Sequence, residues 1–280
     1  MAMKQSLRAP AAFWVLLYFV LLSGCASSQQ YVAFARDGVA YTGAVTALVD
    51  RASAVRVESS SYSLLQQHHE LLRKYKGQAL KNALRDSLKQ ANRADLAAIE
   101  NNRQTKNVAI TLQNYFIALQ ELAASTALVD IGAKSSEIIA KLEDALKSQN
   151  RDSFLVSPSV APVIGTHFTE RVLRKELSSR KQIILSALDI LDGQLSTVTR
   201  DIDAQTRNIR KARVALLLLP TFQETILASR LSLSDKERWV TLRQMDILGS
   251  TTEGDDKKAI IAVKTSGSKF RELFMNITSK

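Results

Sequence analysis

The chain has little cysteine, glycine or proline, and these scarcities already limit the possible folds. One cysteine, 10 glycines and 4 prolines occur among 280 residues. A lone cysteine cannot form an internal disulfide, which excludes a disulfide-stabilised scaffold. Few glycines and prolines leave few forced turns, and strong helix formers such as Ala, Leu, Lys, Arg, Gln and Glu are plentiful. The composition therefore predicts an all-α fold built from long helices.

Residue patterns for common chemistries are also scarce. The three histidines are His68, His69 and His167. A zinc-protease motif needs a second histidine four residues after the first, but an arginine follows His69 at that distance. Ser-x-x-Lys occurs at 178–181 and 266–269, at about the frequency expected by chance, without the other motifs of penicillin-binding enzymes. Phosphate-binding loops and calcium loops are missing as well. We therefore expect no catalytic residues, no metal and no cofactor other than covalent lipid, and an enzyme of the cell envelope is the weakest alternative.

The only long apolar run lies at the N-terminus. Lys4 and Arg8 precede the uncharged stretch from Ala9 to Leu22, which only Pro10 interrupts. A membrane-spanning helix needs about 20 apolar residues, whereas a signal-peptide core is shorter. The pattern therefore predicts an export signal.

The export signal ends in an aliphatic residue, two small residues and a cysteine: Leu22, Ser23, Gly24 and Cys25. This segment resembles the lipobox of bacterial lipoprotein precursors, a resemblance that covers residues 1–27 only. It implies removal of 1–24, a diacylglyceryl group on Cys25 and acylation of its new amine, so that the lipid anchors the protein. Ala26 stands where an aspartate signals inner-membrane retention in enteric bacteria, which indicates the outer membrane, facing the periplasm, in a Gram-negative source. An ordinary signal peptide or an uncleaved anchor is the alternative.

The mature chain is basic. Without 1–24 it has 36 basic and 27 acidic residues, a formal charge of +9. Export argues against nucleic acid as the partner, so membrane head groups or cell-wall polymers are the anionic partners to consider. A merely solubilising charge is the alternative.

Helical periodicity begins directly after a polar segment, 25–30, which we interpret as a lipidated tether. From Tyr31 to Tyr75 apolar and small residues recur at spacings of four and three: Phe34, Gly38, Tyr41, Val45, Leu48, Ala52, Val55, Ser59 and Tyr62. This is a coiled-coil-like heptad seam. Gly77 is a plausible helix stop. Beyond it we expect one long helix or two joined near residues 100–107, and then another helix at 126–149.

Residues 151–165 contain two prolines and several serines and are interpreted as a hinge loop between two halves, 31–150 and 166–280. A second long helix is predicted from Thr166, with the clearest seam of the chain: Ile184, Leu188, Leu191, Leu195, Val198, Ile202, Gln205 and Ile209. Residues 249–257, which include two glycines, are predicted as a flexible loop. The whole predicts an elongated helical bundle with long, coiled-coil-like helices.

One stretch is a candidate binding surface. Nine basic residues between Arg73 and Lys106 are opposed only by Asp86, Asp95 and Glu100. We call seven of them the basic stripe: Arg73, Lys74, Lys76, Lys81, Arg85, Lys89 and Arg93. The main hypothesis is a non-enzymatic structural or protein-interaction module, with an envelope protein or a second copy as partner. The alternative is an envelope binding protein that holds peptidoglycan or anionic lipid through the basic stripe. A solvated helix face would explain the stripe without any function.

Overall fold

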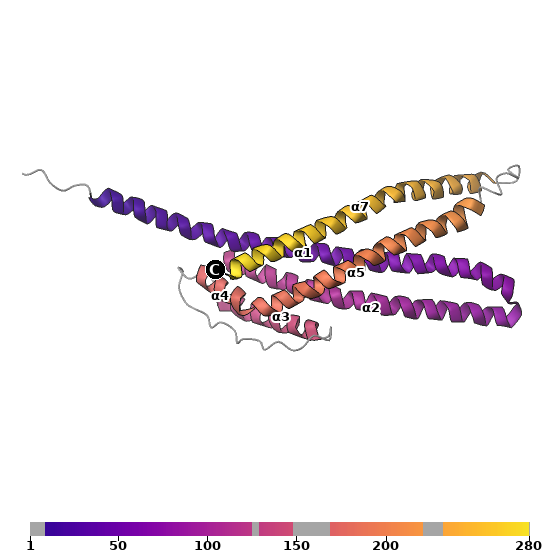
Figure 1. Ribbon diagram of the computed structural model, residues 1–280, viewed down its shortest axis with the longest axis horizontal. Coiled ribbons are helices and arrows are strands. Elements are labelled where there is room, and N and C mark those ends of the chain that lie inside the picture. Colours follow the sequence, from indigo (N-terminus) through magenta and orange to yellow (C-terminus); the bar gives the residue numbers. More distant parts are fainter. Residues whose placement is uncertain (1–8, 125–128, 148–168, 221–231, 280) are drawn as a thin grey trace, which may run out of the picture. The chain divides into compact units, whose positions relative to one another are not determined.

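The computed structural model describes residues 9–124, 129–147, 169–220 and 232–279. Every regular element in these ranges is helical, which confirms the all-α prediction. The helices are α1 (Ala9–Lys74), α2 (Gly77–Ala124), α3 (Val129–Lys147), α4 (Thr169–Ser179), α5 (Lys181–Arg213), the π-helical turn η1 (Val214–Leu218) and α7 (Leu233–Thr278). Figure 1 shows them in chain order. Within the described residues no helix is long and apolar enough to cross a membrane.

The chain forms two compact units. Unit 1 comprises 1–42, 110–187 and 269–280, and unit 2 comprises 43–109 and 188–268. Each unit therefore takes segments from both of the stretches that the sequence suggested as halves. The proposed hinge at 151–165 lies outside the described residues.

Unit 1 has an aromatic core. The rings of Phe34 and Phe270 stack with centroids 4.9 Å apart, and Phe116 meets both edge to face at 5.7 and 5.0 Å. Such pairs contribute about 0.5–1.5 kcal/mol each beyond the burial of their area. Gly38 makes the approach possible, because a Cβ at this position would lie 2.6 Å from Cδ2 of Phe116. The small residue that weakens the seam in the sequence is therefore the one that admits the Phe116 ring.

The two predicted seams are the buried faces of α1 and α5. All the α1 seam residues from Phe34 to Ser59 are buried and Tyr62 is half-buried. On α5 every seam residue is buried except Gln205, which is half-buried. Seven-residue spacing thus identified the core-facing stripes correctly.

The helix boundaries differ from the prediction in several places. Residues 25–30, the proposed tether, lie within α1. For the polar segment near 100–107, the structure confirms the first of the two predicted alternatives, since the segment lies inside the single helix α2. The helix expected from Thr166 is divided at Arg180, although Arg180 still joins the i to i−4 hydrogen-bond ladder on both sides. The loop prediction for 249–257 is wrong, because α7 runs through this segment. Two isolated glycines lower helix propensity by only about 1 kcal/mol each, which neighbouring turns and packing can outweigh.

A proline explains the π-helical turn. Pro220 lies two residues after the end of η1, and the Leu219 N–H between them donates to the carbonyl oxygen of Val214 in the wider π pattern. Proline has no N–H, and its ring clashes with the carbonyl four residues earlier, so the preceding turn widens. The indole N–H of Trp239 donates to the Leu218 carbonyl oxygen at 3.3 Å.

Candidate functional site

The basic stripe lies on the hairpin that α1 and α2 form in unit 2. Only Tyr75 and Lys76 separate the two helices. The Tyr75 N–H donates to the Leu71 carbonyl oxygen at 2.9 Å, and Gly77 adopts a φ of +59°, a left-handed conformation that suits glycine. The tight turn gathers Arg73, Lys74 and Lys76 at one end of the hairpin.

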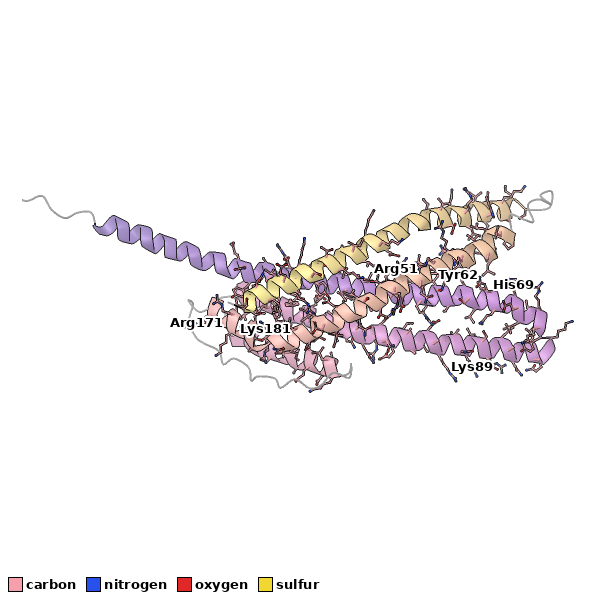
Figure 2. The ribbon with its side chains drawn as sticks, in the orientation of Figure 1. Arg51, Tyr62, His69, Lys89, Arg171 and Lys181 are labelled. Carbon is pink, nitrogen blue, oxygen red and sulfur yellow. The ribbon has the colours of Figure 1, made fainter. Side chains whose placement is uncertain are left out.

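All seven stripe side chains are exposed. Figure 2 shows Lys89 projecting from the side of α2 that faces away from α1. Lys81, Arg85 and Lys89 recur every fourth residue, a spacing that places them along one helix face. The stripe thus combines one cationic face of α2 with three cations at the α1–α2 turn.

Two of the three acids that oppose the stripe in sequence, Asp95 and Glu100, are engaged elsewhere. The Arg56 guanidinium donates to the Asp95 carboxylate at 2.9 Å, and Arg103 pairs with Glu100 at 2.7 Å. The hydrogen bond from Arg103 lowers the pKa of Glu100. Among the described residues no carboxylate lies within ion-pair distance of any stripe cation. Asp95 and Glu100 therefore do not neutralise the stripe.

Exposed leucines accompany the cations on α2. Leu88 is 50% exposed and Leu96 is 65% exposed. At about 100° per residue, Leu96 falls between the directions of Arg85 and Lys89 on the helix wheel. The surface is therefore cationic and partly apolar, a mixture that a count of charges alone did not predict.

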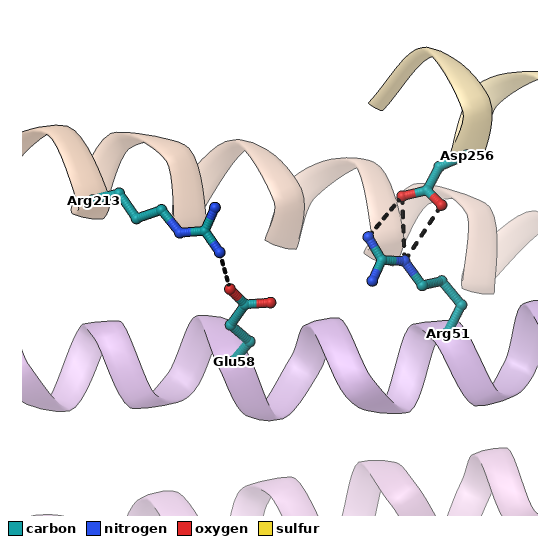
Figure 3. A network of polar contacts seen from close by, with 4 residues as sticks. All are labelled: Arg51, Glu58, Arg213 and Asp256. Atoms are coloured by element: carbon teal, nitrogen blue, oxygen red, sulfur yellow. Dashed lines mark hydrogen bonds and ion pairs between the residues drawn. The ribbon is translucent and has the colours of Figure 1, made fainter. Parts of the chain in front are cut away.

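Two ion pairs connect α1 to α5 and α7 within unit 2 (Figure 3). Arg51 donates to Asp256 through Nε at 3.3 Å and through Nη2 at 3.0 Å, and Arg213 donates to the Glu58 carboxylate. Arg213 also donates to the Tyr62 hydroxyl at 3.1 Å. Burial lowers the pKa of Arg213, but the contacts with Tyr62 and Glu58 outweigh it and raise the pKa overall. These contacts fix helix register and do not form a reactive cluster.

Unit 1 contains a second polar group, which is buried. Glu176 and Arg180 are 5% and 2% exposed, and the Ser135 hydroxyl donates to the Glu176 carboxylate at 3.2 Å. The hydroxyl of Tyr115 is fully enclosed and has no hydrogen-bond partner among the described residues. Burial raises the pKa of Tyr115 well above its usual value, and the negative charge of Glu176 adds to the effect. The charges of both Glu176 and Arg180, which pair with each other, act on this phenol.

The remaining candidates are not brought together. His68 and His69 are exposed on α1, and no group of three metal-ligating side chains occurs in the part of the chain that the structure describes. Ser266 donates its hydroxyl to the Val263 carbonyl oxygen at 2.9 Å, an ordinary helical contact. His167 lies outside the described residues, as do the side chains of the lipobox, including Cys25. Lipidation of Cys25 stays a prediction.

Comparison of the chain with known protein families, curated proteins and solved structures found no match.

Proposed function

We propose that this chain is a lipoprotein precursor whose mature form is anchored in the outer membrane through lipid on Cys25 and faces the periplasm. There it acts as a non-enzymatic helical module for structure or protein interaction. The observation that carries the proposal is the lipobox at Leu22–Cys25 after a short apolar run. Tyr31 and Phe34, 4% and 0% exposed, support it, since packing begins a few residues beyond the acylated cysteine.

The anchor is tested by mass spectrometry and membrane fractionation in the source cell. We expect the N-terminal peptide to begin at Cys25 and to carry acyl chains, and Cys25→Ala to leave the protein unprocessed and outside the outer-membrane fraction. Ser28→Ala, which spares the lipobox, is the matched control. An unmodified Cys25 in the wild-type protein would falsify the anchoring proposal.

The sorting signal is tested separately. Ala26→Asp introduces the residue that resembles an inner-membrane retention signal, so we expect the lipidated protein to move to the inner-membrane fraction. Unchanged sorting of this variant would contradict the outer-membrane assignment but leave the lipid anchor standing.

The interaction role is supported by an apolar stripe on α7. Leu233, Val240 and Ile247 follow a seven-residue spacing, Ile261 lies fourteen residues further along, and their exposed fractions are 73%, 48%, 49% and 64%. Residues seven apart lie on one helix face, which is the pattern a partner helix recognises. Single exposed apolar residues are common on protein surfaces, but a row in register is a docking feature.

Crosslinking in the cell tests this role. We expect Val240→Glu together with Ile247→Glu to abolish crosslinked species that form through α7, because each buries a charge in an apolar contact. Thr241→Glu with Gln244→Glu adds the same charge beside the stripe and should leave them intact. Equal crosslinking of both variants and the wild type would remove α7 as the interface.

A second candidate function is anion binding by the basic stripe, favoured by seven exposed cations that have no ion-pair partner in the part of the chain that the structure describes. Lys81→Glu, Arg85→Glu and Lys89→Glu together should weaken binding to anionic vesicles or peptidoglycan by roughly tenfold or more, since each cation contributes about 1 kcal/mol near an anionic surface. The control is the same reversal at three exposed α5 cations, Arg200, Arg207 and Lys211. This candidate is contradicted if the binding affinity changes neither when salt is added nor when the three stripe charges are reversed.

A further inference from the structure

Unit 2 contains a half-open cavity of about 220 Å³ between α1, α2 and α5. Small residues contribute much of its lining, among them Ser59 and Ser63 on α1 and Ala91 and Ala94 on α2. Leucines at such positions would fill the space between neighbouring helices. The cavity is therefore a consequence of side-chain choice in one stretch of the helix interface.

Polar groups without partners line this cavity. Ser59 is only 3% exposed, and its hydroxyl makes no hydrogen bond among the described residues. The hydroxyl of Ser63 and the amides of Gln205 and Asn208, which enter from α5, also line the cavity without a hydrogen bond among the described residues, but Gln205 is half-buried and Ser63 and Asn208 are exposed. Buried polar groups are normally hydrogen-bonded, so the buried Ser59 hydroxyl, which lines a cavity without a partner, indicates a ligand or ordered water.

The charges around the cavity cancel. Arg56 and Asp95 both line it and pair at 2.9 Å, and the Ser60 hydroxyl also donates to Asp95. Asp95 is 8% exposed, so an anion would meet a nearly buried carboxylate, and a cation would meet the Arg56 guanidinium. Uncompensated charge in such a site is costly, which leaves neutral polar molecules as ligands.

We infer that this cavity binds a neutral, polyhydroxylated molecule about the size of a monosaccharide. Its volume corresponds to about seven water molecules, too small for most drug-sized ligands. The serine hydroxyls and the two amides supply both donors and acceptors, as sugar hydroxyls require. The site is independent of the lipid anchor and of both interaction surfaces proposed above.

Saturation-transfer NMR on the full mature protein in detergent tests the inference, with N-acetylglucosamine as the probe. We expect saturation transfer to this sugar, and much weaker transfer to glucosamine, which is cationic, and to glucuronate, which is anionic. Absence of transfer to N-acetylglucosamine overturns the inference, as does equal transfer to all three compounds.

Variants locate the binding. Ala94→Leu places a larger side chain in the cavity lining and should raise the dissociation constant at least tenfold, whereas Ala97→Leu should leave it unchanged, because Ala97 is exposed like Ala94 but lies outside the lining. Gln205→Ala and Asn208→Ala provide a second pair in case Ala94→Leu does not fold, and each should weaken binding severalfold. Equal binding by all these variants and the wild type assigns the signal to another surface and overturns the proposal.

Discussion

At the scale of single residues, the enclosed hydroxyl of Tyr115 is a cost without a compensating contact. A buried polar group that lacks a partner destabilises a fold by about 1–3 kcal/mol. Tyr115→Phe removes the hydroxyl and keeps the ring against Phe116, whose centroid lies 5.7 Å away. We expect the free energy of unfolding to rise by about 1 kcal/mol, measured by urea denaturation at neutral pH. A loss of stability would show that the hydroxyl has a partner after all.

The same tyrosine should give the protein an alkaline limit. Burial raises the pKa of Tyr115 in the folded state, with Glu176 adding to the shift, so the unfolded state loses its proton first as pH rises. The free energy of unfolding is therefore unaffected by this group below the pKa of tyrosine in the unfolded state, about 10. Above that pH the free energy of unfolding declines by up to 1.4 kcal/mol per pH unit. Urea titrations above pH 10 should show a steeper decline for the wild type than for Tyr115→Phe, and parallel curves would contradict the assignment.

Replacing two helical glycines with alanine should change the stability of the fold in opposite directions. Gly38→Ala places a Cβ against Phe116 and should cost about 1–3 kcal/mol through forced repacking of the aromatic core. Gly193 on α5 is exposed with nothing within 4 Å of an added Cβ, so Gly193→Ala should stabilise by about 0.5–1 kcal/mol. Thermal denaturation of the two variants measures the contrast, and a loss at both sites would mean that the space around Gly193 is not open.

At the scale of elements, the periodicity of the sequence predicted the buried faces of the helices better than the residues at which the helices begin and end. The seams from Phe34 to Ser59 and from Ile184 to Ile209 could be read from sequence because burial of one stripe dominates a long helix. The interruption at Arg180 and the π turn before Pro220 depend on local backbone geometry, which residue spacing does not encode. In the same way the basic stripe was readable as charge, whereas the pairing of Asp95 with Arg56 and the cavity beside it require tertiary contacts.

The corrected segment of α7 yields a prediction about helix propensity. If 249–255 is helical, Gly249→Ala with Gly254→Ala should raise the free energy of unfolding by about 1–2 kcal/mol, because each glycine lowers helix propensity. Gly77→Ala is the control and should lower the free energy of unfolding. Gly77 has a φ of +59°, a conformation that costs a residue with a Cβ about 1–2 kcal/mol. Circular dichroism with thermal denaturation measures both, and an unchanged double variant would restore the loop interpretation.

At the scale of the whole molecule, each compact unit draws on distant parts of the chain. Unit 1 requires segments near both termini and in the middle, and unit 2 joins 43–109 to 188–268. This partition was not readable from sequence, because the Pro- and Ser-containing stretch at 151–165 is the most visible break in composition. Contact between residues far apart in sequence is set by packing and leaves no local signature.

Fragments should therefore fold poorly by themselves. We expect 31–150 and 166–280, expressed separately, to lack a cooperative thermal transition, since each omits parts of both cores. The mature chain, under the same conditions, is the control and should melt sharply. A sharp transition in either isolated fragment would contradict this expectation.

The chain crosses between the units at 42/43, 109/110, 187/188 and 268/269, each time inside a helix. No uninterrupted stretch of coding sequence therefore specifies either unit. A single recombination event can copy a domain that is encoded in one piece, but it cannot transplant either of these units into another gene. The two units are therefore inherited together.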